Sequence, residues 1–419
     1  MSADRRAQWS WAAYDWANSA FATTVLAGFF PIWFKQYSAA GLAATTSTFY
    51  LGLFSSLVSV VVMILSPLLG QRADRLGAHK RYLLIFTVLG ATATGLLPLA
   101  GQGQWLLALL LFSLASIGFF GGLTPYDSLI VSVASPERLD RVSSIGFAAG
   151  YLGGGLLFAV NVVMTVQPGW FGLADAGAAV RVSFLSVALW WLLFAWPLFR
   201  NVAQPPPGAV SGVAGWRQFW QTVGELRAHR SAGLFLLAYW LYIDGVDTII
   251  RMAVDFGLAL GFESTSLIKA LLLVQFIGFP AALLFGRLGE RIGTRRAIFV
   301  ALAVYAGVTV WGYFLRTEGQ FYAMAAAIGC VQGGIQALSR SYFAALVPPG
   351  RAGAWFGVYN MMGKFAAVFG PIVVGATAVL TGDSRLSILS VLFFFITGAL
   401  LLARVREPDG GFSAADERG

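Results

Sequence analysis

The sequence contains few charged residues and almost no cysteine or histidine. Only 11% of its 419 residues are charged, whereas soluble globular proteins carry about 25%. The single cysteine, Cys330, cannot form an internal disulfide or a cysteine metal cluster. The two histidines, His79 and His229, do not form part of a recognisable nucleophile, base and orienting group, or of a metal-ligand cluster. We therefore expect neither an enzyme nor a protein with a metal or another cofactor.

Hydrophobic residues, by contrast, make up 58% of the chain. They form long runs without charge at 58–69, 83–99, 105–123 and 386–403. A membrane-spanning helix needs about 20 apolar residues, so several of these runs are long enough to cross a bilayer. The first apolar segment, of about 24 residues, exceeds the core of about 7 to 15 residues found in signal peptides. We expect this segment to remain as the first membrane helix.

The hydrophobic pattern predicts an all-α membrane protein with twelve transmembrane helices in two six-helix bundles. The expected helices of the first bundle are 11–34, 47–70, 82–101, 105–134, 143–167 and 180–199. Those of the second bundle are 232–260, 264–286, 297–315, 320–347, 352–380 and 385–403.

Positive charge is distributed unevenly between the two sides of this predicted topology. The termini and the loops on their side hold 20 of the 28 lysine and arginine residues, the opposite loops hold five, and three fall inside helices. Cytoplasmic loops of membrane proteins collect lysine and arginine, so both termini are predicted to be cytoplasmic. The same bias accounts for the net charge of +9 without nucleic acid as a partner. We expect a bacterial inner-membrane protein that is a monomer.

The predicted organisation is a bundle at 1–199, a cytoplasmic linker at 200–231, a bundle at 232–403 and a disordered tail at 404–419. The linker opens with three prolines and continues with apolar residues at helical spacing, accompanied by arginines. These apolar residues are Trp216, Phe219, Trp220, Val223 and Leu226. The pattern favours an amphipathic helix on the lipid of the inner leaflet; a solvated linker is the alternative.

Two segments of the sequence repeat. The loop after the second helix contains Gly70, Asp74, Arg75 and Gly77, and a similar loop after the eighth helix, 216 residues later, contains Gly286, Glu290, Arg291 and Gly293. A pair of glycines also precedes a proline by 14 residues twice, at 122–136 and at 334–348. Two six-helix halves related in parallel are typical of one large class of transporters.

The repeated Gly-x-x-x-Asp-Arg-x-Gly loop resembles the signature of the major facilitator superfamily. Within that superfamily, the segments 14–21, 244–251 and 339–341 resemble the vacuole-effluxer-like permeases. This resemblance implies the major facilitator fold and alternating access. It also implies that the first, fourth, seventh and tenth helices line a central cavity.

Charged residues inside membrane helices are costly and are candidates for function. Asp15 and Asn18 share one helix face, as do Asp244 and Asp247. Either pair is a candidate proton or solute site; a structural polar pair is the alternative. Three further candidates for binding solute or proton are Arg251, Gln336 and Lys364. Arg251 has acids four residues away on both sides, so an intrahelical ion pair is an alternative for this residue.

The resemblance also implies gating residues. It places the acid Asp74 at the start of the eleventh helix, near Arg351, and the acid Glu290 at the start of the fifth, near Arg141. Arg75 and Arg291, which follow these acids in the two loops, are further candidate gate residues. The glycine-to-proline register puts Asp127 and Arg340 at neighbouring positions of facing helices. We expect an ion pair between Asp127 and Arg340 to close the inner mouth of the cavity; pairing of each residue within its own half is the alternative.

The function predicted from these patterns is secondary active transport of a small polar organic solute, such as an amino acid, with protons as a candidate coupling ion. A cation-coupled sugar symporter is a second interpretation, because an Asp followed by an Asn in the first helix also resembles sugar symporters of the superfamily. A non-transporting membrane sensor is a third. Solute flux in reconstituted vesicles distinguishes a sensor from a transporter.

Overall fold

The chain folds almost entirely into helices. The computed structural model describes residues 3–208, 215–259, 262–381 and 384–406. Within these residues, eleven helices are long and apolar enough to cross a membrane, and α14 adds another long helix of 30 residues. A bilayer offers no water to the backbone, so an apolar segment satisfies its N–H and C=O groups by forming a helix. The predicted all-α membrane fold is confirmed.

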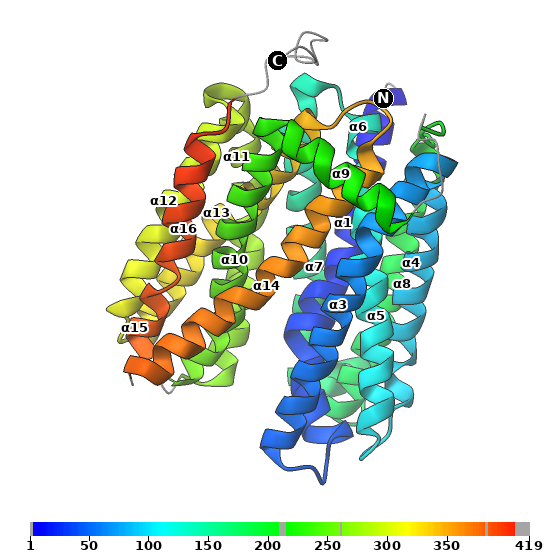
Figure 1. The fold of residues 1–419 in the computed structure, drawn as a ribbon. Coiled ribbons are helices and arrows are strands. Elements are labelled where there is room, and N and C mark those ends of the chain that lie inside the picture. The colour runs from blue at the N-terminus through cyan, green and yellow to red at the C-terminus, as the bar shows by residue number, and fades with distance from the viewer. Residues whose placement is uncertain (1–2, 209–214, 260–261, 382–383, 407–419) are drawn as a thin grey trace.

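Residues 3–208 of the structure form six long helical segments, whose arrangement is shown in Figure 1. They are a first segment composed of α1 (Ala3–Ala20), η1 (Phe21–Phe29), α2 (Phe30–Trp33) and η2 (Phe34–Ser38), then α3 (Ala44–Leu76), α4 (His79–Leu96), α5 (Trp105–Ser128), α7 (Leu139–Val166) and α8 (Ala176–Asn201). Short helices η3 (Leu97–Leu99), α6 (Ile130–Val133), η4 (Pro136–Arg138) and η5 (Pro168–Phe171) lie between them.

The connection between the halves contains α9 (Trp216–Ala228). The second half consists of α10 (Arg230–Ala259), α11 (Ser264–Ile292), α12 (Thr294–Tyr313), α13 (Glu318–Leu346), α14 (Ala352–Thr381), α15 (Ser384–Leu389) and α16 (Leu392–Ala403). Two predicted boundaries differ notably from the structure. The first helical segment runs from Ala3 to Ser38 rather than 11–34, and the last predicted helix is divided between α15 and α16.

The first segment is unusual because η1 and η2 are π-helical. π-Helical turns in proteins are mostly single and are frequent at functional sites. Here η1 extends over nine residues and buries Phe21, Thr23, Thr24 and Val25. Thr23 accepts a hydrogen bond of 2.7 Å from the Gln275 side chain of α11. The π-helical stretch therefore contacts the other half of the molecule.

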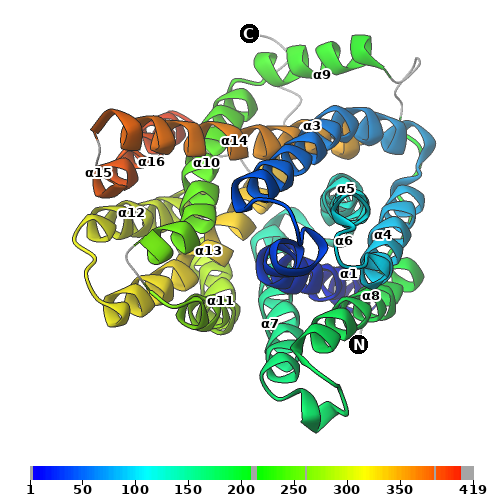
Figure 2. The ribbon, with the colours of Figure 1, turned by 90° about the horizontal axis from the view of Figure 1, so that it is seen from below.

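The start of α1 and the end of α16 lie at the same end of the molecule (Figure 1). We call this end the terminus side. The most extensive packing between the halves pairs α3 with α14 and α7 with α11. Towards the opposite end the helices of the two halves diverge, and α14 tilts away from α3 (Figure 1). Viewed along the helices, the halves form two adjoining groups, with α3, α7, α11 and α14 at the seam (Figure 2).

The outer helices have one side packed against the protein and an opposite side that is apolar and exposed. On α8, Trp191 is fully buried, whereas Leu189, Leu193 and Trp196 are 69%, 67% and 63% exposed. Large apolar residues exposed at helical spacing are unfavourable in water but suit a hydrocarbon environment. The exposed outer surface of the bundle is therefore of the kind that suits a bilayer.

Candidate functional site

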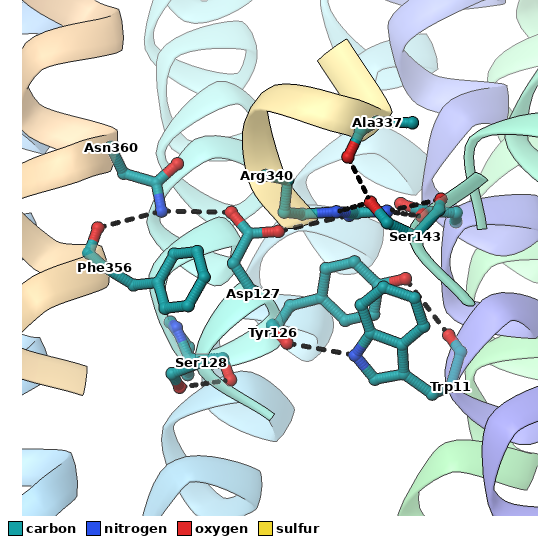
Figure 3. A network of polar contacts seen from close by, with 11 residues as sticks. Trp11, Tyr126, Asp127, Ser128, Ser143, Ala337, Arg340, Phe356 and Asn360 are labelled. Carbon is teal, nitrogen blue, oxygen red and sulfur yellow. Dashed lines mark hydrogen bonds and ion pairs between the residues drawn. The ribbon is translucent and has the colours of Figure 1, made fainter. Parts of the chain in front are cut away.

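A buried arginine lies between the two halves. Arg340 of α13 is 3% exposed, and its Nη1 atom lies 3.2 Å from Oδ1 of Asp127 on α5. Its Nη2 atom lies 3.2 Å from Oδ2 of Asp15 on α1. Its Nε atom donates to the hydroxyl of Ser143 on α7, at 3.0 Å. One guanidinium of the second half thus joins three helices of the first half (Figure 3).

Aromatic rings enclose the same guanidinium. The Arg340 Cζ atom lies 4.7 Å from the ring centroid of Trp11 and 4.4 Å from that of Phe147. Tyr126 stacks on Trp11 with centroids 4.7 Å apart. A side chain at Gly146 would meet Asp15 Oδ2 at 2.5 Å and Arg340 Nη2 at 3.0 Å, so glycine provides the space for the network. A planar cation stacked on aromatic rings and held by two carboxylates is favoured by both kinds of contact.

Helix α14 contributes the other side of this network. The Asn360 side-chain amide donates to Oδ2 of Asp127 at 3.1 Å and to the Phe356 carbonyl at 3.1 Å (Figure 3). Lys364 follows Asn360 by four residues and therefore shares its helix face. The Lys364 Nζ atom lies 3.0 Å from the ring centroid of Phe120 on α5. Amide, ammonium and aromatic groups thus lie beside the Arg340 network, further from the terminus side.

The remaining candidate solute and proton residues are placed as follows. Asn18 and Asp244 are buried, whereas Asp247 and Gln336 are partly buried. The Asp244 carboxylate accepts the backbone N–H of Gly370 at 2.8 Å. In the described contacts, Asp15 is joined to Arg340, whereas Asp244 is not. The Arg251 side chain lies outside the residues whose side chains the structure describes.

Asp74 connects α3 to the start of α14. Its two carboxylate oxygens accept the backbone N–H groups of Gly353 and Ala354, both at 2.7 Å. The first N–H groups of a helix have no partner within the helix and carry partial positive charge, so an anion is favoured there. His79 lies 3.1 Å from the same carboxylate. The structure thus places Asp74 at the helix end expected from the sequence. The first N–H group that it accepts, that of Gly353, lies two residues after Arg351.

Asp74→Asn is expected to loosen the start of α14. An asparagine side chain can accept only one of the two N–H groups and has no charge. Hydrogen bonds to charged groups are worth about 1.5–3 kcal/mol. Amide hydrogen exchange over residues 352–358, followed by mass spectrometry, should become at least about tenfold faster. Asp175→Asn is the matched control because Asp175 caps α8 through Ala178 N at 2.7 Å, away from the seam. Unchanged exchange in Asp74→Asn would show that the cap does not hold this helix end.

The second repeated loop is arranged differently. Glu290 and Arg291 are exposed, and in the part of the chain that the structure describes, α7 has no side-chain cap at its start. Instead Asp140, in the first turn of α7, accepts hydrogen bonds from Thr294, at 2.7 Å, and from Ser341. The acid that connects α7 to the second half is therefore Asp140 of α7 itself rather than Glu290 of the second repeated loop. Arg75 of the first loop is partly buried.

In the contacts described above, the two halves have different chemical roles. The acids Asp15, Asp74, Asp127 and Asp140 all lie in the first half. Apart from His79 of the first half, which contacts Asp74, the groups that donate to these acids come from the second half. They are the side chains of Arg340, Asn360, Thr294 and Ser341 and the N–H groups of Gly353 and Ala354. The two sequence repeats are thus related in backbone but complementary in charge.

Several members of this interface were not singled out from the sequence, and three of them carry much of the network. Ser143, Asp140 and Asn360 are polar residues near the ends of predicted helices, where polar residues are ordinary. A sequence signal existed for Asn360, which lies one helical turn before Lys364. Ser143 lies three residues before Gly146, on the same face as the small-residue run at 146–154.

The comparisons with known proteins agree with this architecture. The family model described as "Vacuole effluxer Atg22 like" matches residues 130–414, and that of the major facilitator superfamily matches residues 3–158. A protein of Bacillus subtilis, described as an uncharacterized MFS-type transporter, is 37% identical over 95% of this chain and 94% of its own length. An autophagy-related protein 22 of Penicillium rubens is 27% identical over 63% of this chain and 49% of its own length.

Solved structures share the fold. The human organic anion transporter MFSD10 has a TM-score of 0.75 at 15% identity, covering 96% of this chain and all of its own. The proton:xylose symporter XylE has a TM-score of 0.68 at 14% identity, covering 99% of this chain and 98% of its own. These proteins are transporters, not enzymes. The resemblance expected from the repeated loops is confirmed, and the chain belongs to the Atg22-like vacuole effluxer family of the major facilitator superfamily.

Proposed function

We propose that this transporter moves a small polar organic solute by alternating access, and that the Arg340 network is its inner gate. The observation that carries the proposal is the guanidinium of α13 held by Asp15, Asp127 and Ser143, on three helices of the other half. An opening of the terminus side has to separate these groups. A buried ion pair is costly to break in a dry site, whereas an opened, wetted site tolerates both charges.

The lysine and arginine bias supports cytoplasmic termini and a location in the bacterial inner membrane. With that orientation, Asp74, Asp140 and the Arg340 network all close the cytoplasmic side. The divergence of the helices at the other end (Figure 1) supports a state that faces outward. The solute site is then on the side of the gate away from the terminus side, where Asn360 and Lys364 share one face of α14. An ammonium and an amide there suit a solute with a carboxylate, such as an amino acid.

Proton coupling follows from the charges of the gate. One guanidinium faces two carboxylates, so the buried cluster carries an excess negative charge unless one carboxylate holds a proton. Excess charge in a buried site is strongly unfavourable. We infer that a proton on Asp15 or Asp127 accompanies closure of the inner gate, and that opening to the cytoplasm releases it.

Identification of the solute comes first. A thermal-shift screen of purified protein against amino acids, sugars and drugs should reveal a ligand, because a ligand bound to the native state raises its stability. Uptake of that ligand into proteoliposomes, with a pH indicator inside, then measures transport and proton movement together. A stabilising ligand that is never transported would favour a sensor, and a sugar as the only ligand would favour a sugar symporter.

Asp15→Asn and Asp127→Asn are each expected to uncouple transport from protons. Either change leaves one carboxylate for Arg340, so the cluster is neutral without a proton. Solute exchange should be retained, whereas uptake driven by a pH gradient should fall to the level of passive exchange. Asp244→Asn is the control, because the described contact of that carboxylate is to the backbone of Gly370. Unchanged pH-driven uptake in both Asp15 and Asp127 variants would refute the coupling role.

A further inference from the structure

Helix α9 lies across the seam between the halves at the terminus side. In both views it lies outside α3 and α14 rather than among the spans (Figures 1 and 2). Its inner side buries Phe219, Thr222 and Leu226, which are at most 6% exposed. Its outer side exposes Trp216 by 51% and Trp220 by 65%. The helix therefore has one side on the protein and a second, aromatic side directed outward.

The inner side of α9 contacts both halves. At its start, the backbone N–H of Gly215 donates to Gln71 of α3 at 3.3 Å. Near its end, Glu225 forms an ion pair of 2.7 Å with Arg351, which also donates to Thr222 at 3.2 Å. Arg351 directly precedes α14, two residues before the N–H groups that Asp74 accepts. The helix thus joins α3 to the same end of α14 that Asp74 holds.

The outer side of α9 combines aromatic and positive residues. Trp216 and Trp220 are four residues apart and share a face. Arg217 and Arg227 of α9 and Arg230 just beyond it are exposed. Tryptophan favours the boundary between headgroups and acyl chains, and arginine is attracted by anionic headgroups. The neighbouring helix α3 exposes Leu57 and Ile64 by 51% and 41%, so α9 lies beside a helix with an exposed apolar face.

We propose that the outer side of α9 binds anionic phospholipid of the inner leaflet, and that this binding favours closure of the terminus side. Lipid that holds α9 in place also holds Glu225 and Thr222 against Arg351, and so holds α14 near α3. By linkage, a ligand that prefers the closed arrangement shifts the population towards it. The inference goes beyond solute transport because it assigns the linker helix a lipid ligand and a role in setting the conformational equilibrium.

The binding is tested by tryptophan quenching in nanodiscs. Brominated phosphatidylglycerol is compared with brominated phosphatidylcholine at equal mole fraction. The chain has 14 tryptophans, so the signal of α9 is the difference between the parent and Trp216→Phe/Trp220→Phe. We expect stronger quenching by the anionic lipid, since each arginine near an anionic surface favours binding by roughly fivefold.

Arg217→Gln/Arg227→Gln should lower the quenching to that of phosphatidylcholine. Arg138→Gln/Arg200→Gln, which removes the same charge from other exposed positions, should leave it unchanged. Equal quenching by both lipids, unaffected by the arginine changes, would overturn the anionic preference. No quenching by either lipid would place the face in water, available to a soluble partner, and would overturn the proposal as a whole.

The coupling to conformation is tested by spin-label distances. Two exposed positions away from the terminus side are labelled in a Cys330→Ser background. They are Gln102→Cys, in the turn before α5, and Gly319→Cys, in the first turn of α13. Phosphatidylglycerol should increase the population with the long distance. Glu225→Gln should abolish this response but retain the lipid quenching. An identical distance distribution in both lipids, or a full response in Glu225→Gln, would refute the coupling. Neither measurement uses solute flux, so a failed transport assay leaves both results interpretable.

Discussion

Replacement of Arg340 by glutamine is expected to abolish solute uptake. The change leaves Asp15 and Asp127 in a buried site without their cation, and removal of one partner of a buried ion pair costs about 3–5 kcal/mol. The terminus side should then stay open, and the rate of uptake in proteoliposomes should fall by on the order of a hundredfold or more. Arg340→Lys should be intermediate, because lysine keeps the charge but cannot contact both acids through a planar fork.

A charge swap between positions 127 and 340 is expected to fail by itself. Asp127→Arg with Arg340→Asp restores one ion pair but places the new carboxylate at position 340 against Asp15. The swap alone should therefore remain inactive, and adding Asp15→Asn should recover solute exchange without proton coupling. The proposed gate would be contradicted if the Arg340→Gln variant transported solute at the parental rate. It would also be contradicted if the charge-swap variant were fully active without Asp15→Asn.

Gly70→Ala is expected to open the terminus side by a steric effect. A side chain at Gly70 would overlap the carbonyl of Gly353, and one at Gly357 would meet Cα of Pro67 at 2.7 Å. Helices α3 and α14 therefore pack with their backbones in contact. Overpacking costs about 1–3 kcal/mol, which shifts a two-state population by roughly tenfold or more.

The measurement is maleimide labelling of Ser128→Cys, a fully buried position beside the gate, in a Cys330→Ser background. Labelling should become roughly tenfold faster in Gly70→Ala. Gly52→Ala is the control on the same helix, because nothing lies within 4 Å of a side chain there. Equal labelling rates in the two variants would show that contact between the helix backbones does not limit opening.

Hydrophobic periodicity and the repeated loops were sufficient to predict the fold, because lipid forces apolar segments into helices. The resemblance to the superfamily then predicted which helix end Asp74 would approach. The proximity of Asp127 and Arg340 followed from the glycine-to-proline register, which fixes the relative depth of two facing helices. That register does not determine how a third helix, the one that carries Asp15, is rotated about its own axis. Asp15 was therefore predicted to belong to a proton or solute site without a contact to Arg340, whereas the structure shows it against the same guanidinium.

Glu290 illustrates a second reason why sequence reasoning was incomplete. The repeat implied that the second loop uses its acid as the first loop does. In the structure, the acid at this junction is Asp140 of the opposite helix, and Glu290 is exposed. Either arrangement places one anion at the seam, so both satisfy the same electrostatic requirement. A motif match cannot distinguish which side supplies the charge.

The unequal distribution of acids and donors between the halves has a consequence for assembly. Two copies of the first half placed face to face would oppose acid to acid, and two copies of the second half would oppose donors to donors. Only unlike halves offer complementary surfaces at the terminus side. The two halves of the duplicated sequence therefore associate like the unlike subunits of a heterodimer. When they are expressed as separate polypeptides, each half should pair with the other half in preference to a second copy of itself.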